Sequence, residues 1–504
     1  MPSARDAGIA SSVADARSAD AGVASNGAAM PGTPSGEPDG EPNRARSVDV
    51  APSVAPYRDI AKRILEASAS DNAAWQKVAD LADLAGARLS GSPALDRAIQ
   101  WARDVFQREG HENVSLEPVL VPHWIRGSES AELTAPIARA LHILGLGGTV
   151  ATPPGGITAD VLVVASFDEL EQRKADAAGK IVLLNHPMPR TADPGHDYSE
   201  SYVYRGSGAV RAAPLGAVAV LVRSLTTTSM ETPHTGAMTY GDAPKKIPAA
   251  AISLEDADLI ARLAARGGPV KVHLSLGAHA AKDAPSANVI AEIRGREKPD
   301  EVVVLGAHID SWDVGQGAQD DGAGCAIVMQ SLTTLRRLNL IARRTIRVVL
   351  YTNEENGSRG ARQYAVDHRA ELARHVAAFE VDTGSGVPLG VVTEGDPPFR
   401  DELRDVMTLL APIGATTVIP AYAGSDIREM KSAGVPLFGL RLDMSTYFDV
   451  HHSAADTLDR VDPAHLQKSV AALATLAYVI ADRESRWTMP PEAAPAPTPP
   501  PSKR

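Results

Sequence analysis

An aliphatic run at Val302–Gly306 leads directly into a polar, glycine-rich stretch, His308–Gly324. The run is typical of a buried strand, and open α/β sheets bind their ligands at the carboxyl ends of such strands. Further along the chain, three more polar positions follow strand-like hydrophobic runs: the Glu354-Glu355 pair, Asp382 and His452. This repeated arrangement predicts an α/β fold whose functional side chains gather at one edge of a sheet.

Strands and helices alternate after Ser286, which predicts a mostly parallel, mixed sheet with helices on both faces. Helices are predicted near 323–337, 360–371, 399–410 and 463–482, and strands near 302–305, 345–352, 376–381 and 435–442. Earlier in the chain, helical periodicity begins at Tyr57 and returns near 74–85, and Ser92-Pro93 starts a third helix that Gly110 ends. We therefore expect residues 53–128 and 286–488 to form one discontinuous domain.

Residues 129–285 have a different texture, with strand-like pieces separated by loops rich in Gly, Pro and Thr. The pieces are Asp160–Val164, Lys180–Leu184 and Ala217–Val222, with short helical patches only around 167–178 and 254–265. We interpret this segment as a β-rich insert, and it contains none of the candidate ligands. The two ends of the chain, 1–52 and 489–504, have few large apolar residues. Because such segments cannot form a core, we expect both to be disordered.

Composition excludes several classes of protein. The chain has 504 residues, with 50 Lys+Arg against 62 Asp+Glu and a net charge of -12. It has no basic stripe, so nucleic acid is not an expected partner, and no apolar run reaches the roughly 20 residues that span a membrane. Cys325 is the only cysteine, so no intrachain disulfide can form. No signal peptide is visible, which favours a cytoplasmic location by default.

The polar positions carry imidazole and carboxylate, the side chains that bind zinc. Two histidines, two aspartates and a glutamate are enough for two zinc ions when one carboxylate bridges them. Asp320 is the expected bridge because the chain can bend sharply in its glycine-rich turn. Neighbouring residues at a strand end point different ways, so one of Glu354 and Glu355 can bind metal while the other acts as general base. Asp310, two residues after His308, is a candidate partner for that imidazole.

The same residues carry a family resemblance. The motifs are His308-Ile-Asp-Ser-Trp-Asp-Val-Gly-Gln-Gly-Ala-Gln-Asp-Asp-Gly322, Asn353-Glu-Glu355, Glu380-Val-Asp382-Thr-Gly384, Gly424-Ser-Asp-Ile-Arg428, and Tyr447-Phe with His451-His-Ser453. Together they resemble the co-catalytic di-zinc exopeptidases, which include bacterial leucyl aminopeptidases and glutamate carboxypeptidase, and most closely the carboxypeptidase Q type. The insert is similar to a protease-associated domain through Gly179–Leu183 and Ile247–Ile252.

The resemblance implies a role for each position. His308 and Asp382 would bind one zinc, Glu355 and His452 would bind the other, Asp320 would bridge the two, and Glu354 would be the general base. It also implies a cis peptide between Asp320 and Asp321. His451 is expected to be structural. Ser425, Asp426 and Tyr447 are expected at the substrate, with Tyr447 either an oxyanion donor or a packing aromatic.

The activity that the resemblance implies is zinc-dependent hydrolysis of dipeptides or short peptides with free termini, by an exported protein that forms a homodimer. An aminopeptidase that acts on longer peptides is the alternative. A single-zinc transferase that cyclises N-terminal glutamine belongs to another class, and the complete two-zinc ligand set argues against it. A binding module with a structural zinc would need a closed site of four protein ligands, whereas five ligands shared between two ions leave open positions.

Overall fold

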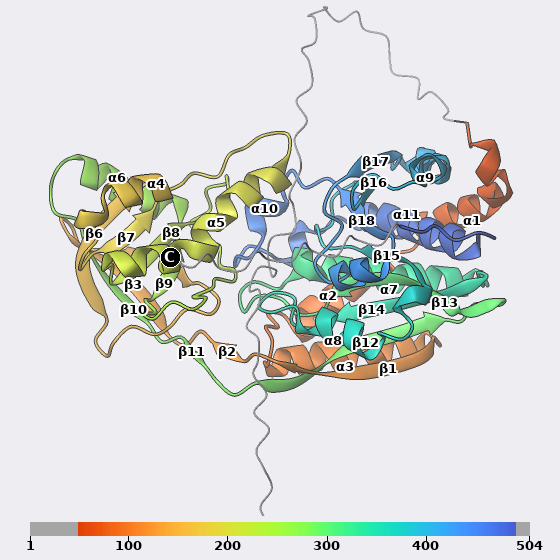
Figure 1. The fold of residues 1–504 in the computed structure, drawn as a ribbon, viewed down its shortest axis with the longest axis horizontal. Coiled ribbons are helices and arrows are strands. Elements are labelled where there is room, and N and C mark those ends of the chain that lie inside the picture. Colours follow the sequence, from red (N-terminus) through yellow and green to blue (C-terminus); the bar gives the residue numbers. More distant parts are fainter. Residues whose placement is uncertain (1–48, 490–504) are drawn as a thin grey trace, which may run out of the picture.

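The computed structural model describes residues 49–489, which form two lobes lying side by side (Figure 1). Each lobe is built around an eight-stranded sheet. One lobe combines the beginning and the end of the described chain, and the other is built from residues 129–276 and is called the insert below. The ends predicted to be disordered, 1–52 and 489–504, lie almost wholly outside the described residues.

The larger sheet has the strand order β1-β12-β14-β13-β15-β18-β16-β17. Its strands are β1 (Glu112–Val121), β12 (Ala284–Ile293), β13 (Lys298–His308), β14 (Arg344–Tyr351), β15 (His375–Glu380), β16 (Pro388–Thr393), β17 (Thr417–Pro420) and β18 (Leu437–Leu442). The central strands β14, β13, β15 and β18 run parallel, whereas β1, β12 and β16 make antiparallel pairs. The predicted mostly parallel, mixed sheet is confirmed. Because the four central strands are parallel, their carboxyl ends lie at the same edge of the sheet.

Helices cover both faces of this sheet. They are α1 (Arg58–Ala69), α2 (Ala73–Leu84), α3 (Pro93–Arg108), α7 (Ala323–Arg337), α8 (Arg359–Asp367), α9 (Arg400–Met407) and α11 (Pro463–Asp482). The short α10 (Tyr447–Val450) instead packs against the insert. Most of the covering helices pack into one large core on one face, and α8 packs with a smaller apolar cluster on the other. The expected caps are present: Ser92 accepts a hydrogen bond from the Leu95 amide, and Asp462 accepts one from Ala464.

Helix α11 is apolar along most of its length. By length and composition it could cross a membrane, although no apolar run of that length was expected from the sequence. Within the described structure 78% of this stretch is buried, against α1 and α7. We therefore interpret α11 as the central helix of the larger core.

The sheet of the insert has the order β4-β3-β10-β6-β7-β8-β9-β5. Its strands are β3 (Glu129–Ala135), β4 (Arg139–Leu141), β5 (Ile143–Gly145), β6 (Ile157–Val164), β7 (Ile181–Leu184), β8 (Ala219–Arg223), β9 (Ala249–Ile252) and β10 (Lys271–Leu276). Helices α4 (Phe167–Gln172), α5 (Pro194–Ala212) and α6 (Leu254–Ala265) accompany it. A short pair of strands, β2 (Trp124–Ile125) and β11 (His279–Ala280), lies where the chain passes between the lobes (Figure 1).

The prediction of only two short helical patches in the insert was wrong, because α5 has 19 residues. Its sequence lacks a regular apolar stripe and contains glycines that lower helix propensity. Tertiary packing explains one of them: a Cβ at Gly208 would lie 2.6 Å from Leu184 Cδ1, so the helix approaches the sheet closely there. Asp193 caps the helix and Pro194 starts it.

Helix α5 also carries the contact between the lobes. Its Tyr198 belongs to an apolar cluster with Met188 and Leu225 of the insert and with Tyr447 and Phe448 of α10. The rings of Tyr198 and Phe448 stack with their centroids 4.5 Å apart. Figure 1 shows α5 and α10 facing each other where the lobes meet. The insert is therefore packed against the loop that carries the predicted ligand His452.

A polar cluster away from this junction fastens β1 to the segment after α8. Its centre is His368, whose ring contacts the carboxylates of Glu117 and Glu371. Burial lowers the pKa of His368, but hydrogen bonds to those two carboxylates outweigh it and raise the pKa to about 9. Because the folded pKa is raised, the stabilisation is fully present below the unfolded value of about 6.5. It is lost as the pH rises through about 9.

We expect His368→Gln to lower the free energy of unfolding by about 1 to 2 kcal/mol near pH 6, after allowance for partial solvent screening. The difference between wild type and variant should shrink as the pH rises to about 10, where the imidazole is neutral in both states. Denaturant unfolding across this pH range measures it. A difference that stays constant with pH would show that the charge of His368 does not stabilise the fold.

Candidate functional site

The predicted site residues converge at the carboxyl edge of the larger sheet. His308 is the last residue of β13, Glu354 and Glu355 follow β14, and Asp382 follows β15. Because these three strands are neighbours and run parallel, their ends lie side by side. The loop after α10 brings His452 to the same place. All of these side chains except that of Asp382, which is partly exposed, are buried.

Asp320 lies between two halves of this cluster. On one side its Oδ1 is 3.1 Å from His308 Nε2, and that nitrogen is 3.5 Å from Asp382 Oδ1. On the other side its Oδ2 is 3.1 Å from His452 Nε2, which is also 3.1 Å from Glu355 Oε2. The five predicted ligand positions therefore form two groups that share one carboxylate.

The neighbouring Asp321 has a different place. Its carboxylate accepts hydrogen bonds from the backbone amides of His308, at 3.1 Å, and Gly324, at 2.9 Å. It thus joins the end of β13 to the start of α7. The peptide between Asp320 and Asp321 is cis, as the family resemblance implied. The geometry therefore puts Asp320, and not Asp321, between the two imidazoles.

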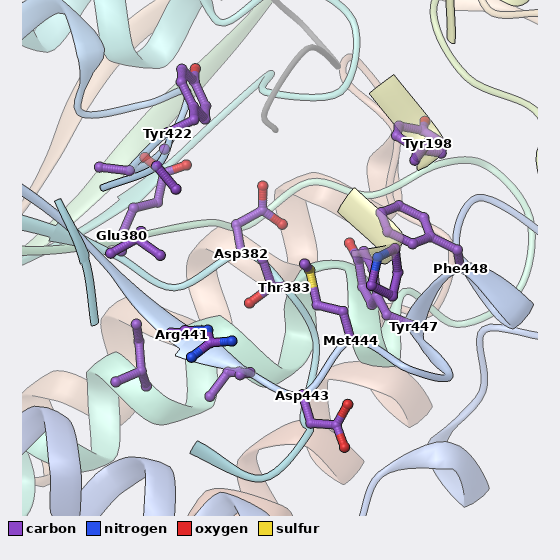
Figure 2. A pocket seen from close by; sticks show the side chains of 18 of the residues that line it. Tyr198, Glu380, Asp382, Thr383, Tyr422, Arg441, Asp443, Met444, Tyr447 and Phe448 are labelled. Carbon is purple, nitrogen blue, oxygen red and sulfur yellow. The ribbon is translucent and has the colours of Figure 1, made fainter. Parts of the chain in front are cut away.

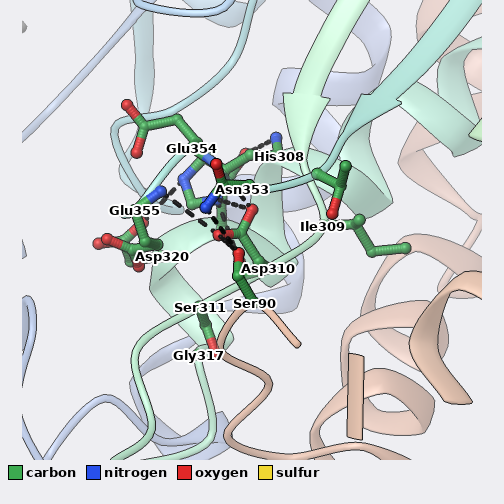
Figure 3. A network of polar contacts seen from close by, with 12 residues as sticks. Ser90, His308, Ile309, Asp310, Ser311, Gly317, Asp320, Asn353, Glu354 and Glu355 are labelled. Carbon is green, nitrogen blue, oxygen red and sulfur yellow. Dashed lines mark hydrogen bonds and ion pairs between the residues drawn. The ribbon is translucent and has the colours of Figure 1, made fainter. Parts of the chain in front are cut away.

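Asp310 contacts His308 in a way that differs from the expectation. His308 Nδ1 lies 3.0 Å from the backbone carbonyl oxygen of Asp310, which is the hydrogen-bond acceptor. The Asp310 carboxylate oxygen Oδ1 lies farther from the same nitrogen, at 3.8 Å. The carboxylate instead accepts from the amides of Glu354 and Glu355, at 3.0 and 3.3 Å (Figure 3). Asp310 therefore fixes both the imidazole and the Glu354-Glu355 pair, because one residue offers two acceptors.

Two further buried carboxylates were not predicted as site residues. Asp456 accepts from the amides of Ala318 and Gln319, at 3.0 and 2.7 Å, and from that of Asp320, at 3.1 Å. Burial raises the pKa of Asp456 to about 7. Glu380, on β15, accepts from three successive amides at positions 425 to 427. For Glu380, the Glu380-Val-Asp382 motif was a signal in the sequence. Asp456 had none, because its hydrogen bonds run to backbone amides distant in sequence.

His451, which was expected to be structural, lies in contact with the cluster. Its Nε2 is 3.3 Å from Asp320 Oδ2, and its ring stacks on that of His452 with centroids 3.6 Å apart. One group of ligand atoms within 4.8 Å of one another is formed by Asp320, His451 and His452, and a second by His308, Asp320 and Asp382. His451 therefore offers a possible ligand beyond the predicted set.

The electrostatics of the cluster suit a bound cation. Burial raises the pKa of Glu355 to about 7, and the Asp320 carboxylate adds to the shift. Burial also raises the pKa values of Glu354 and Asp382. Glu355 Oε1 is buried without a hydrogen-bond partner among the described residues. Buried carboxylates are normally paired or bound to metal, so this set of oxygen and imidazole donors fits divalent cations.

A cavity of about 330 Å³ opens onto the cluster. Figure 2 shows Tyr198 and Phe448 on one side of it, Tyr422 and Glu380 on the other, and Asp382 between them. Apolar residues make up much of the remaining wall, and they are Leu389, Val392, Ile419, Pro420, Ala421, Leu440, Leu442 and Met444. An apolar cavity with a few convergent polar groups is the usual form of a small-molecule site.

The residues predicted at the substrate do not all line this cavity. Ser425 and Tyr447 do, and burial raises the pKa of the Tyr447 hydroxyl well above its ordinary value. Asp426 does not line the cavity and is fully buried, and its amide donates a hydrogen bond to Glu380. The insert was not expected at the site, yet its Asp193 and Tyr198 belong to the cavity wall. The packing of α5 on α10 brings them there.

Comparisons with known proteins identify the family of the chain. The model of peptidase family M28 matches residues 288–477. Carboxypeptidase Q of Mus musculus is 43% identical over 439 residues, which cover 86% of this chain and 92% of that protein. The chain therefore belongs to peptidase family M28 and is a metallopeptidase. Within the family it is similar to carboxypeptidase Q, including the Homo sapiens protein at 42% identity over 439 residues.

Solved structures show the same fold. The peptidase M28 precursor from Shewanella amazonensis SB2B superposes with a TM-score of 0.84 at 36% identity, covering 87% of this chain and 99% of that one. A zinc aminopeptidase from Bacillus subtilis superposes with a TM-score of 0.60 at 19% identity, over 82% of this chain and 95% of that one. The peptidase fold of this chain therefore has precedents among solved structures.

We expect Asp310→Ala to lower the free energy of unfolding by about 2 to 4 kcal/mol, because two buried amides lose their acceptor. Denaturant unfolding measures this. Asp313→Ala is a matched control, since Asp313 pairs with Arg126 at a partly exposed position and its loss should cost about 1 kcal/mol at most. Equal losses in the two variants would contradict the bracing role of Asp310.

Proposed function

We propose that the chain is a zinc-dependent exopeptidase that hydrolyses dipeptides or short peptides with free termini. The observation that carries this proposal is the buried Asp320 carboxylate, shared between His308 with Asp382 on one side and His452 with Glu355 on the other. Two related proteins support it by name, a carboxypeptidase and a zinc aminopeptidase.

Two zinc ions per chain fit the two groups. His308 and Asp382 would hold one, His452 and Glu355 the other, and Asp320 would bridge them, with His451 as a further donor near the second. When bound, zinc supplies a Lewis acid for the scissile carbonyl and lowers the pKa of the attacking water.

Glu354 is the proposed general base. Figure 3 shows its carboxylate turned away from those of Asp320 and Glu355, and it lines the cavity. Its backbone is fixed through Asp310. Burial raises the pKa of Glu354 above its ordinary value. Glu354 would accept a proton from the attacking water and deliver it to the leaving amine. The Tyr447 hydroxyl would donate to the developing oxyanion.

The cavity favours short substrates with a free carboxylate. Helix α5 of the insert and α10 bound it on one side, which limits the length of chain that fits. Among the described residues that line it, Arg441 is the only lysine or arginine. Its Nη1 donates to Thr417 Oγ1 at 2.9 Å, and a guanidinium fork matches a carboxylate. An aminopeptidase acting on longer peptides remains the alternative.

We further propose the domain division expected from the sequence. Residues 53–128 and 286–488 form the peptidase domain, and residues 129–285 form a protease-associated-like insert. The two separate sheets support this division. Homodimerisation and export, both implied by the family resemblance, stay predictions.

The proposed activity predicts that purified protein hydrolyses an unblocked apolar dipeptide. A chelator should abolish the activity, and added zinc should restore it, because the metal activates the water. The N-blocked and C-amidated forms should be cleaved more slowly. Fast cleavage of the amide and of longer peptides would favour the aminopeptidase alternative, and zinc-loaded protein inactive on every free peptide would contradict the exopeptidase proposal.

Arg441→Gln tests the recognition of the carboxylate. We expect kcat/KM for the free dipeptide to fall about tenfold or more, since a charge-assisted bidentate contact is lost. The rate for the C-amidated dipeptide should stay near that of wild type, which serves as the internal control. An unchanged preference for the free carboxylate in this variant would remove Arg441 from the proposal.

The division of labour between the adjacent glutamates gives another prediction. Glu354→Gln should lower kcat by about a thousandfold while both zinc ions stay bound, because only proton transfer is lost. Glu355→Gln, the matched control, should reduce zinc content instead. Zinc per chain measured by elemental analysis, together with kcat, distinguishes them. Loss of zinc in the Glu354 variant and retention in the Glu355 variant would reverse the assignment.

A further inference from the structure

The two imidazoles of the proposed ligand set are held in the same way. Each directs Nε2 at Asp320 and places Nδ1 against a backbone carbonyl oxygen. For His308 this oxygen belongs to Asp310, at 3.0 Å and within the same lobe. For His452 it belongs to Thr235, at 3.3 Å, and Thr235 lies in the insert. One half of the site is therefore oriented locally and the other half by the second lobe.

Thr235 also fixes the backbone of His452. Its amide donates to the His452 carbonyl at 2.8 Å. His452 has a φ of 58°, a left-handed conformation that costs a residue with a Cβ roughly 1 to 2 kcal/mol. Such a conformation persists only where the surroundings impose it. The paired contacts with Thr235, one to the ring and one to the backbone, come from the insert and provide that constraint.

The position of Thr235 depends in turn on a buried cation. Arg205 of α5 is 1% exposed, and its Nη1 donates to the Thr235 carbonyl at 3.1 Å and to the Tyr198 hydroxyl at 2.7 Å. Gly236 has a φ of 141°, and a Cβ there would lie 2.3 Å from Arg205 Cζ. The guanidinium therefore lies directly against this loop. Thr235 Oγ1 adds a hydrogen bond to Gly145 O at 2.8 Å.

We propose that the insert is a structural part of the metal centre, with Arg205 as a positioning residue that acts through the Thr235 carbonyl. A carbonyl oxygen has two lone pairs, so it accepts from Arg205 and from His452 Nδ1 together. This fixes the His452 tautomer that leaves Nε2 unprotonated and directed at Asp320 and Glu355. Histidines that bind metal commonly donate their other ring N–H in this way. The inference rests on the proposed zinc-dependent function.

Zinc affinity in Arg205→Met tests the inference without relying on activity. Titration against a competing chelator should show one zinc bound as in wild type and the other weakened about 10- to 100-fold. Gly236→Ala should weaken the same zinc, because its methyl group displaces the guanidinium. Wild-type affinity for both ions in these folded variants would overturn the inference.

Arg344→Met is the matched control. Arg344 is also 1% exposed, and its guanidinium donates to the backbone carbonyls of Ala481 and Glu484 in the other lobe. Its loss should lower stability and leave both zinc affinities unchanged. Wild-type protein that binds no zinc would contradict the proposed function itself, whereas equal zinc binding by wild type and the Arg205 variant would contradict only this inference.

A measurement on wild-type protein remains decisive even where a variant fails to fold. In the ¹⁵N NMR spectrum of zinc-loaded protein, the His452 ring should show a protonated Nδ1, assigned by the loss of its signals in His452→Gln. A deprotonated Nδ1 would overturn the inference, because the Thr235 carbonyl would then have no proton to accept.

Discussion

The site depends on a single carboxylate, that of Asp320, held between two buried imidazoles. Its oxygens lie 3.1 Å from His308 Nε2 and 3.1 Å from His452 Nε2. Burial alone would raise the pKa of Asp320, but its contacts with these imidazoles hold the pKa well below its ordinary value. A buried charge is tolerated only when it is well paired. The position of Asp320 therefore has to be fixed closely, and the surrounding acids do this.

Four of the buried acids around the site accept hydrogen bonds from backbone amides. Asp321 binds the amides of His308 and Gly324, Asp456 holds the turn that carries Asp320, and Asp310 and Glu380 each fix a neighbouring loop. Preorganised ligands reduce the cost of forming a metal site. This explains why more carboxylates gather at the site than can bind a cation. Removing one of the acids that bind backbone should displace the ligands rather than remove a ligand.

The parts of the fold that the sequence predicted are those whose own residues determine their structure, through hydrophobic periodicity or capping. Hydrophobic runs predicted the strand ends, and capping residues predicted helix α11 with its Asp462 cap. Asp456 could not be recognised in this way, because it binds a turn 136 residues distant in sequence. Helix α5 was missed because its glycines lower helix propensity, and only tertiary contact explains Gly208, which packs against the sheet of the insert. Tyr198 and Thr235 reach the site only because the lobes dock, which no local pattern encodes.

A crystal structure with anomalous scattering recorded on both sides of the zinc absorption edge tests the central claim most directly. We predict two zinc peaks, one on each side of the Asp320 carboxylate, with His308 and Asp382 at one and His452 and Glu355 at the other. A single peak, or two peaks that do not share Asp320, would contradict this account of the site.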